Sequence, residues 1–187
     1  MFTKIFKIIL KKLRNFVLGD FRSKKLSSLI VKKILRYNKK KTLTILDYGS
    51  GFQPKVVLFV YKELVTEHKK KVIFDCYDFY SKANIRKLNQ NSNKKIKFHH
   101  INSLKTNKKR YDFCLINDVI HHIGIEKETL IKKILMDLLK ISKIVFIKDH
   151  FQQGFLSNNI IRFMDFLGNY FNNVSIPVIY YDKKTFE

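Results

Sequence analysis

Thr42-Leu-Thr-Ile-Leu-Asp-Tyr-Gly-Ser-Gly-Phe52 is the stretch of sequence that decides the predicted fold. Its apolar, partly β-branched first half is typical of a strand buried inside a parallel sheet. Asp47 ends that strand, and the turn Gly49-Ser50-Gly51 follows. Glycine permits positive φ and lets backbone N–H groups approach a ligand, so this stretch predicts a site for a small polar molecule. A Gly-x-Gly turn alone is a weak signal, because tight turns use glycine whatever their function.

Strand and helix patterns alternate along the rest of the chain. Expected strands cover residues 42–47, 71–78, 96–101, 111–117 and 143–148, and expected helices cover 23–37, 55–68, 81–90 and 126–139. Alternation at this spacing is typical of a parallel sheet with helices on both faces. The chain of 187 residues is long enough for one α/β domain with a substantial core.

Three regions are expected: N-terminal basic helices over 1–41, a ligand-binding core over 42–150, and a substrate-side segment over 151–187. Residues 1–18 have the pattern of a basic amphipathic helix, interpreted first as a lid over the domain. The alternative is attachment to an anionic membrane surface. Charges interrupt the apolar run too often for a membrane span, and no small-residue cleavage site for a signal peptide is evident.

Composition limits the classes of function. A hydrophobic content of 45% argues against disorder. Cys76 and Cys114 fall within expected strands and lack metal-ligand spacing, so we expect reduced core thiols in a cytoplasmic protein, with the inner face of the membrane as the alternative location. The net charge of +23 would suit RNA, phospholipid or an acidic substrate, but the lysines are spread along the chain as an AT-rich coding sequence would spread them.

Polar residues follow every expected strand. They are Asp47, Gly49 and Gly51 after the first, Asp78 after the second, Asn102 and Ser103 after the third, Asn117 and Asp118 after the fourth, and Lys148, Asp149 and His150 after the fifth. Ligands of open parallel sheets bind at the carboxyl ends of the strands. The sequence therefore predicts one binding site at this edge.

Leu46-Asp-Tyr-Gly-Ser-Gly51, the acidic end of the second strand, and Tyr111-Asp-Phe-Cys-Leu-Ile-Asn-Asp-Val-Ile-His-His122 resemble class I S-adenosylmethionine-dependent methyltransferases over residues 42–150. The resemblance implies a three-layer Rossmann-like methyltransferase fold with a parallel sheet in the order 3-2-1-4-5. It implies S-adenosylmethionine as cofactor, with the glycine turn against the methionine part, Asp78 on the ribose hydroxyls and Asn102 beside the adenine. The full set of implied cofactor-binding residues is Asp47, Gly49, Ser50, Gly51, Asp78, Asn102, Ser103 and Asn117.

Two alternatives concern this cofactor site. Asp75 competes for the ribose diol, but its charge falls within the strand, and we prefer Asp78. A nicotinamide dinucleotide is the weaker interpretation, because Gln53 stands where a third glycine would be expected.

The region after the fifth strand resembles a bacterial group of class I methyltransferases without an assigned substrate. The residues that carry this resemblance are Lys148-Asp-His150, Arg162-Phe-Met-Asp165, Gly168-Asn169, Pro177 and Tyr180-Tyr181. We expect His150 and His122 as candidate bases, with Lys148 and Asp149 paired to orient His150, or with Lys148 on an acidic substrate group. We expect the acceptor beside His121, Arg162, Asp165, Asn169 and Tyr180.

Simpler interpretations of the same residues stay open. One of His121 and His122 would pack against the sheet, Asp118 would cap the following helix, and Arg162 would pair with Asp165. The spacing of His and Asp is not diagnostic of a metal site, and none is predicted.

The C-terminal hairpin of the family is missing from the pattern, which predicts a truncated C-terminus. Only 174–181 offers a further extended segment. The edge of the fifth strand is then either covered by 155–181 or exposed, and an exposed edge favours a homodimer. The predicted function is methyl transfer to a small-molecule acceptor, with a non-catalytic module or a peripheral membrane or RNA binder as the alternative.

Overall fold

The computed structural model describes residues 20–51, 54–123, 127–152, 154–169 and 180–182. Five strands form one parallel sheet in the order β3-β2-β1-β4-β5. They are β1 (Thr42–Tyr48), β2 (Lys71–Asp78), β3 (Ile96–His100), β4 (Tyr111–Asn117) and β5 (Ser142–Lys148). The strand order and the parallel direction confirm the prediction from sequence.

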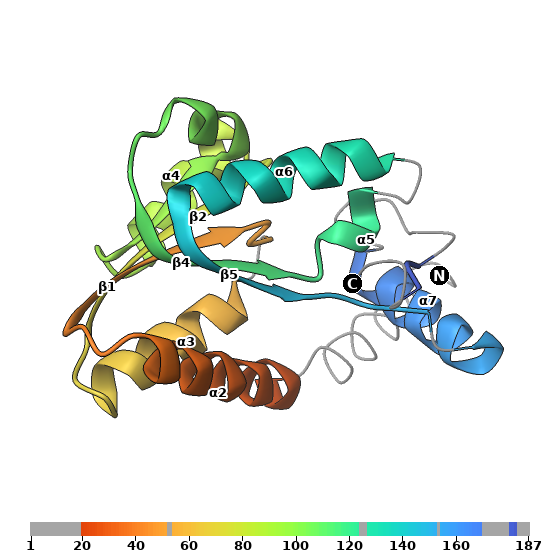
Figure 1. Ribbon diagram of the computed structural model, residues 1–187, viewed down its shortest axis with the longest axis horizontal. Coiled ribbons are helices and arrows are strands. Elements are labelled where there is room, and N and C mark those ends of the chain that lie inside the picture. Colours follow the sequence, from red (N-terminus) through yellow and green to blue (C-terminus); the bar gives the residue numbers. More distant parts are fainter. Residues whose placement is uncertain (1–19, 52–53, 124–126, 153, 170–179, 183–187) are drawn as a thin grey trace, which may run out of the picture.

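Helices cover both faces of this sheet, with α2 and α3 on one side and α6 on the other (Figure 1). The first face carries α2 (Asp20–Tyr37), α3 (Lys55–Thr66) and α4 (Lys82–Asn91), and the second carries α5 (Ile120–Ile123) and α6 (Glu128–Ile141). A 3₁₀ helix, η1 (Ile101–Thr106), follows β3, and α7 (Phe155–Asn169) follows β5. The three predicted layers are therefore present.

The strands supply side chains to both layers because successive residues of a strand point to opposite faces. Leu43 and Ile45 of β1 pack in the cluster beneath α2 and α3, whereas Leu46 packs in the cluster beneath α5 and α6. Cys76 and Cys114 are buried free thiols in these clusters, and burial raises the pKa of each. A central strand buried on both faces explains the nearly continuous apolar run that the sequence showed.

Several boundaries differ from the expected ones. Helix α3 ends at Thr66 rather than at residue 68, and α6 continues to Ile141. The single turn of α5 was not predicted, because four residues are too few to show a helical period. Ser81 was expected inside α4 but caps it, accepting a hydrogen bond from the Asn84 N–H.

Some expectations concern residues outside the described ones. The amphipathic segment 1–18 lies there, as does most of 174–181. Tyr181 is described and forms one isolated parallel bridge with Phe151. Among the described residues no strand pairs beyond β5, so β5 is the edge of the sheet there. No helix of the described part is both long and apolar enough to cross a membrane.

A buried carboxylate ties β4 to β1 where their ladder begins. The backbone register between these strands starts at Ile45 and Phe113. One residue earlier, the Asp112 carboxylate accepts hydrogen bonds from the Thr44 N–H (3.1 Å), the Thr44 hydroxyl (3.2 Å) and Lys40 Nζ (2.9 Å). Burial alone would raise the pKa of Asp112, but the donors from Lys40 and Thr44 outweigh it and lower the pKa.

Replacing Asp112 by Ala should lower the free energy of unfolding by about 1–3 kcal/mol, because the Thr44 N–H loses its acceptor. Urea denaturation at pH 7 measures this change. The matched control is Asp137→Ala, which breaks an exposed i,i+3 pair with Lys140 on α6 and should cost less than about 0.5 kcal/mol. Equal effects of the two substitutions would contradict the role given to Asp112.

Candidate functional site

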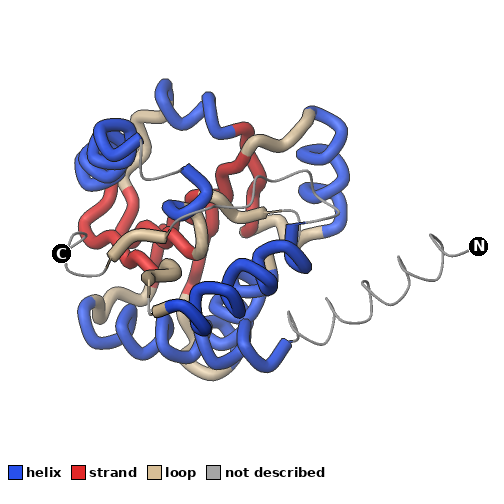
Figure 2. Tube along the Cα trace, turned by 90° about the vertical axis from the view of Figure 1, so that its right-hand side faces the viewer, coloured by secondary structure: helices blue, strands red, loops and turns tan. Residues whose placement is uncertain are grey.

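The polar strand ends gather at one edge of the sheet, which faces the viewer in Figure 2. All five strands are parallel, so their carboxyl ends share this edge. Helix α7 lies beyond these ends, and α2 begins at the same end of the molecule (Figures 1 and 2). The edge is therefore bounded by residues that are far apart in the sequence.

The glycine turn after β1 is held by the end of β2. The Gly49 N–H donates to the Tyr77 carbonyl at 2.8 Å, and the Gly51 N–H donates to Asp78 Oδ2 at 2.7 Å. Asp78 Oδ1 accepts from the Phe79 N–H at 2.6 Å. Asp78 and the glycine turn thus share one side of the sheet edge, which is the arrangement that a nucleoside site between them requires.

Asp75 points elsewhere and already has its partners. Its carboxylate accepts hydrogen bonds from His99, Lys109 and the Tyr111 hydroxyl. Burial alone would raise its pKa, but the donors from His99 and Lys109 bring the pKa to about 2. Asp75 is a buried structural ion, and the geometry favours Asp78 over it as the residue available to a diol.

Glycine is required at both ends of the turn. Gly49 has φ +78° and Gly51 has φ +65°, both in the left-handed region. A Cβ on Gly49 would lie 2.3 Å from Val119 Cγ2, so the turn packs directly against the segment that follows β4. A Cβ on Gly51 would meet no atom within 4 Å, so the space beside Gly51 is open. An open space lined by the turn and by Asp78 fits a bound cofactor.

Asn102 and Ser103 lie on η1, beyond the end of β3, and both are exposed. The Asn102 N–H donates to His100 Nδ1 and the Ser103 hydroxyl donates to the His100 carbonyl, so both residues are fixed to β3. Phe79 follows Asp78 with 76% of its surface exposed, and its ring meets that of His100 edge-on at 6.3 Å. No sequence pattern singled out Phe79, although an exposed aromatic directly after the acidic residue offers a surface for stacking a base.

Asp47 is a buried carboxyl at the end of β1. Burial raises its pKa to about 7, and the nearby negative charge of Asp78 adds to the rise. Hydrogen bonds from Ser50 and Asn117 act in the opposite direction. Asp47 therefore links the glycine turn to the end of β4, and near neutral pH it exchanges a proton.

His121 and Asp149 form a buried pair beyond the ends of β4 and β5. His121 Nδ1 bonds to Asp149 Oδ1, and Asp149 Oδ2 accepts the N–H groups of Val119 (3.2 Å) and Ile120 (2.7 Å). Burial alone would raise the pKa of Asp149, but the bond from His121 and the backbone donors lower it. Asp149, rather than Asp118, therefore holds the N–H groups at the start of α5.

This geometry corrects the expected pairing of Lys148 with Asp149. Lys148 Nζ bonds to Asp118 Oδ1 instead. Asp149 contacts His150 through the backbone, accepting the His150 N–H at 2.7 Å. Asp118 has φ +56° and its side chain turns toward the cations, so it does not cap the helix as the simpler interpretation proposed.

Arg22 of α2 joins this group, although no sequence pattern pointed to it. Its Nη2 lies 3.2 Å from Asp118 Oδ2 and 3.1 Å from His150 Nε2. Burial lowers the pKa of His150, the negative charge of Asp118 opposes this, and Lys148 and Arg22 lower it further. The same Nε2 lies 3.3 Å from Asp118 Oδ1, so it has a neighbour that can only donate, Arg22, and one that can only accept, Asp118.

Of the other residues expected beside the acceptor, Asp165, His122 and Tyr180 lie around His121. Asp165 of α7 has Oδ2 3.6 Å from His121 Nε2 and accepts the Tyr180 hydroxyl at 2.6 Å, which with burial raises the pKa of Tyr180. The His122 ring lies 4.0 Å from that of His121, centre to centre. Arg162 lies on α7, and its positive charge acts on Tyr180. Asn169 ends α7, and its side chain lies outside the description.

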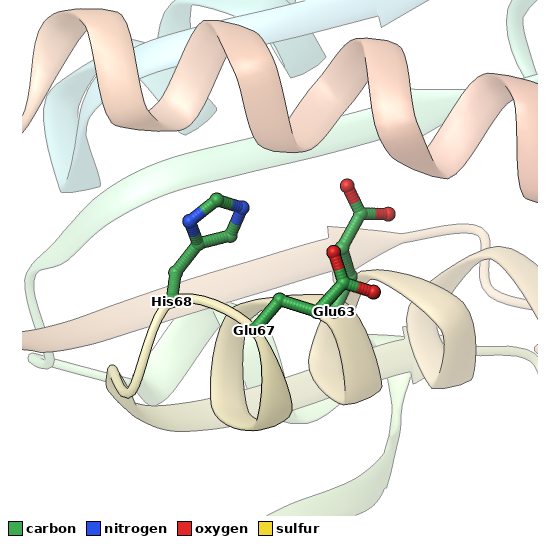
Figure 3. A group of neighbouring side chains, drawn as sticks. All are labelled: Glu63, Glu67 and His68. Atoms are coloured by element: carbon green, nitrogen blue, oxygen red, sulfur yellow. The ribbon is translucent and has the colours of Figure 1, made fainter.

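A separate group of possible metal ligands lies far from this edge, where α3 ends (Figure 3). Glu63, Glu67 and His68 offer ligand atoms within 4.8 Å of one another. Glu63 accepts the Ser28 hydroxyl at 3.0 Å, and Glu67 and His68 are exposed. These residues precede β2, at the opposite edge of the sheet from Asp78, so they form no part of the candidate site.

Comparison with solved structures finds methyltransferases. The plantazolicin methyltransferase BpumL, solved with a substrate analog and S-adenosylhomocysteine (SAH), aligns with a TM-score of 0.53 at 20% identity, over 80% of this chain and 55% of its own. The DszA carbon methyltransferase gives a TM-score of 0.53 at 15% identity, over 75% of this chain and 39% of its own. Magnesium protoporphyrin IX methyltransferase (ChlM) from Synechocystis PCC 6803, solved with bound SAH, gives a TM-score of 0.54 at 11% identity. This alignment covers 87% of this chain and 68% of ChlM.

These likenesses show that the chain has the Rossmann-like fold of these methyltransferases. The chain spans between 39% and 55% of the length of the first two. No family model matches the chain, and no curated protein matches its sequence.

Asp47→Asn should gain stability relative to the parent chain as the pH rises from 4 to 8. Asp47 has a pKa of about 7 in the folded chain against 3.8 in the unfolded one, so the folded chain holds the proton more tightly. Ionisation therefore costs stability above the unfolded pKa, and the cost is complete above pH 7. This loss of unfolding free energy is at most roughly 4 kcal/mol, and it is absent from the Asn variant because asparagine does not ionise.

Urea denaturation of both chains at pH 4, 6 and 8 measures the difference in unfolding free energy. The difference should shift toward the Asn variant through this window and stay constant above about pH 8. A difference that does not change with pH would show that Asp47 is ionised at no cost.

Proposed function

We propose that this chain is an S-adenosylmethionine-dependent methyltransferase acting on a small-molecule acceptor. The observation that carries the proposal is the hydrogen bond from the Gly51 N–H to Asp78, which brings the acidic end of β2 and the glycine turn together. Methyltransferases with SAH bound share the fold, which supports S-adenosylmethionine as the cofactor.

The residues at the edge fit the parts of that cofactor. An ionised carboxylate has about four lone-pair sites, and Asp78 uses two of them on the N–H groups of Gly51 and Phe79, so two remain for the vicinal hydroxyls of a ribose. Phe79 and Asn102 would flank the adenine. Gly49, Ser50 and Asn117 would lie along the methionine part, beside the buried carboxyl group of Asp47.

The cofactor supplies an already activated methyl group, so the protein has to orient the acceptor and remove a proton where the acceptor carries one. His150 suits the second task, because burial lowers its pKa and keeps the imidazole neutral at pH 7, in the form that can accept a proton. His122 is the second candidate base. The buried pair of His121 and Asp149 would position both histidines rather than touch the acceptor.

Charge around His150 supports an acceptor with an acidic group. Arg22 and Lys148 approach from α2 and β5 and would attract an anion, with Asp118 as their shared counter-ion. Asp165 adds a negative charge that also acts on His150. Tyr180 and Asp165 would border the acceptor on the α7 side, with Arg162 and Asn169. The likeness of 148–181 to a bacterial group without an assigned substrate agrees with this proposal but names no acceptor.

Association of two chains through the outer edge of β5 is a further part of the proposal. Ile147 on this strand is 38% exposed, and no strand of the described residues pairs beyond β5, so its backbone groups could pair with a second strand. Sedimentation velocity would detect such a dimer, and a monomer at all accessible concentrations would remove it.

SAH should bind the chain with a micromolar dissociation constant in calorimetry, and Asp78→Asn should weaken this binding by about 100-fold or more. The amide keeps the size of the side chain and one acceptor, but it loses the charge-assisted bonds to two hydroxyls. The melting temperature of the variant, measured in parallel, should change by only a few degrees.

Asp137→Ala removes an exposed carboxylate on α6 and serves as the control, with unchanged affinity expected. If Asp78→Asn bound SAH as tightly as the parent chain, the ribose would not be held by Asp78. If the folded parent chain bound no SAH at all, the methyltransferase proposal would be wrong and a non-catalytic module would replace it.

A further inference from the structure

Helix α7 carries an apolar stripe on its exposed side and an aspartate on its inner side. Asp165 points inward, where it accepts the Tyr180 hydroxyl and approaches the buried His121 ring. The opposite side carries Leu156, Ile160 and Phe163, with 76%, 63% and 54% of their surfaces exposed. Spacing of four and three residues places them on one stripe. Surface helices normally bury such a stripe, so an apolar occupant is expected here.

We infer that the outer stripe of α7 is the docking surface for residues 1–18 of the same chain. The sequence of this segment carries Phe2, Phe6, Ile9, Leu13 and Phe16 at helical spacing, with lysines and Arg14 interleaved. As a helix it has an apolar stripe of its own and a basic side for solvent. Pairing the two stripes covers both without a second molecule.

The start of α2 brings this segment to the right place. Arg22 on the first turn of α2 contacts His150, only five residues before α7 begins. Phe21 beside it is 80% exposed, which extends the apolar surface toward the point where the segment enters. Gly19 in between permits a change of direction.

The lengths also match. Eighteen helical residues span about 27 Å and the fifteen of α7 about 22 Å, so the segment can lie along the whole helix. This inference does not depend on methyl transfer, because it concerns the contact alone.

Hydrogen exchange of the full chain, read by mass spectrometry, tests the contact. Amides of residues 1–18 should be protected in the parent chain, and the double variant Ile160→Ser, Phe163→Ser should exchange there at least about tenfold faster. The control is Met136→Ser, Leu139→Ser on α6, where side chains of similar exposure (59% and 57%) should leave the protection unchanged.

A reciprocal variant keeps the test decisive if the first fails to fold. Phe6→Ser, Leu13→Ser should speed exchange in α7 and leave α3 unchanged. Equal exchange of residues 1–18 in the parent chain and the α7 variant would overturn the inference. Protection of residues 1–18 that appears only with phosphatidylglycerol vesicles would also overturn the inference, in favour of binding to a membrane surface. Protection that is lost on dilution of the protein would overturn it in favour of a second copy of the chain.

Discussion

The bond between the Asp78 carboxylate and the Gly51 N–H joins the two features on which the site depends. A turn with two residues at positive φ has no ladder partner of its own, and the end of β2 provides one. The same carboxylate keeps lone pairs for a ligand because each backbone donor uses only one of them. Asp78 thus shapes the turn and remains available for binding. Asp75, three residues earlier, is not available to a ligand in this way, because its oxygens accept hydrogen bonds from His99, Lys109 and Tyr111.

The carboxyl groups at this edge differ in role because their surroundings differ. Asp47 is buried beside another negative charge and keeps a proton near neutral pH. Asp149 is buried among donors and stays ionised, which fixes His121 and the start of α5. Asp118 is half-exposed between Arg22 and Lys148 and acts as their counter-ion. The neighbours of each carboxyl group therefore decide whether it keeps a proton, accepts backbone hydrogen bonds or pairs with a cation.

The strands and their order followed from the sequence because a buried parallel sheet leaves continuous apolar runs with polar ends. Asp78 followed as well, since its position at a strand end is a local property. The pairing of His121 with Asp149 and the arrival of Arg22 at His150 did not, because these contacts join residues that are 28 and 128 positions apart. The expected pair of Lys148 and Asp149 was wrong for a related reason. Neighbours along a chain that leaves a strand point in opposite directions, and each found its partner on another element.

The most direct test of the account is a crystal structure of the chain with SAH. Both ribose hydroxyls should lie within hydrogen-bonding distance of the Asp78 carboxylate, with the homocysteine part along Gly49 and Gly51. A nucleoside bound elsewhere on the chain, or a ribose facing Asp75 instead, would contradict it.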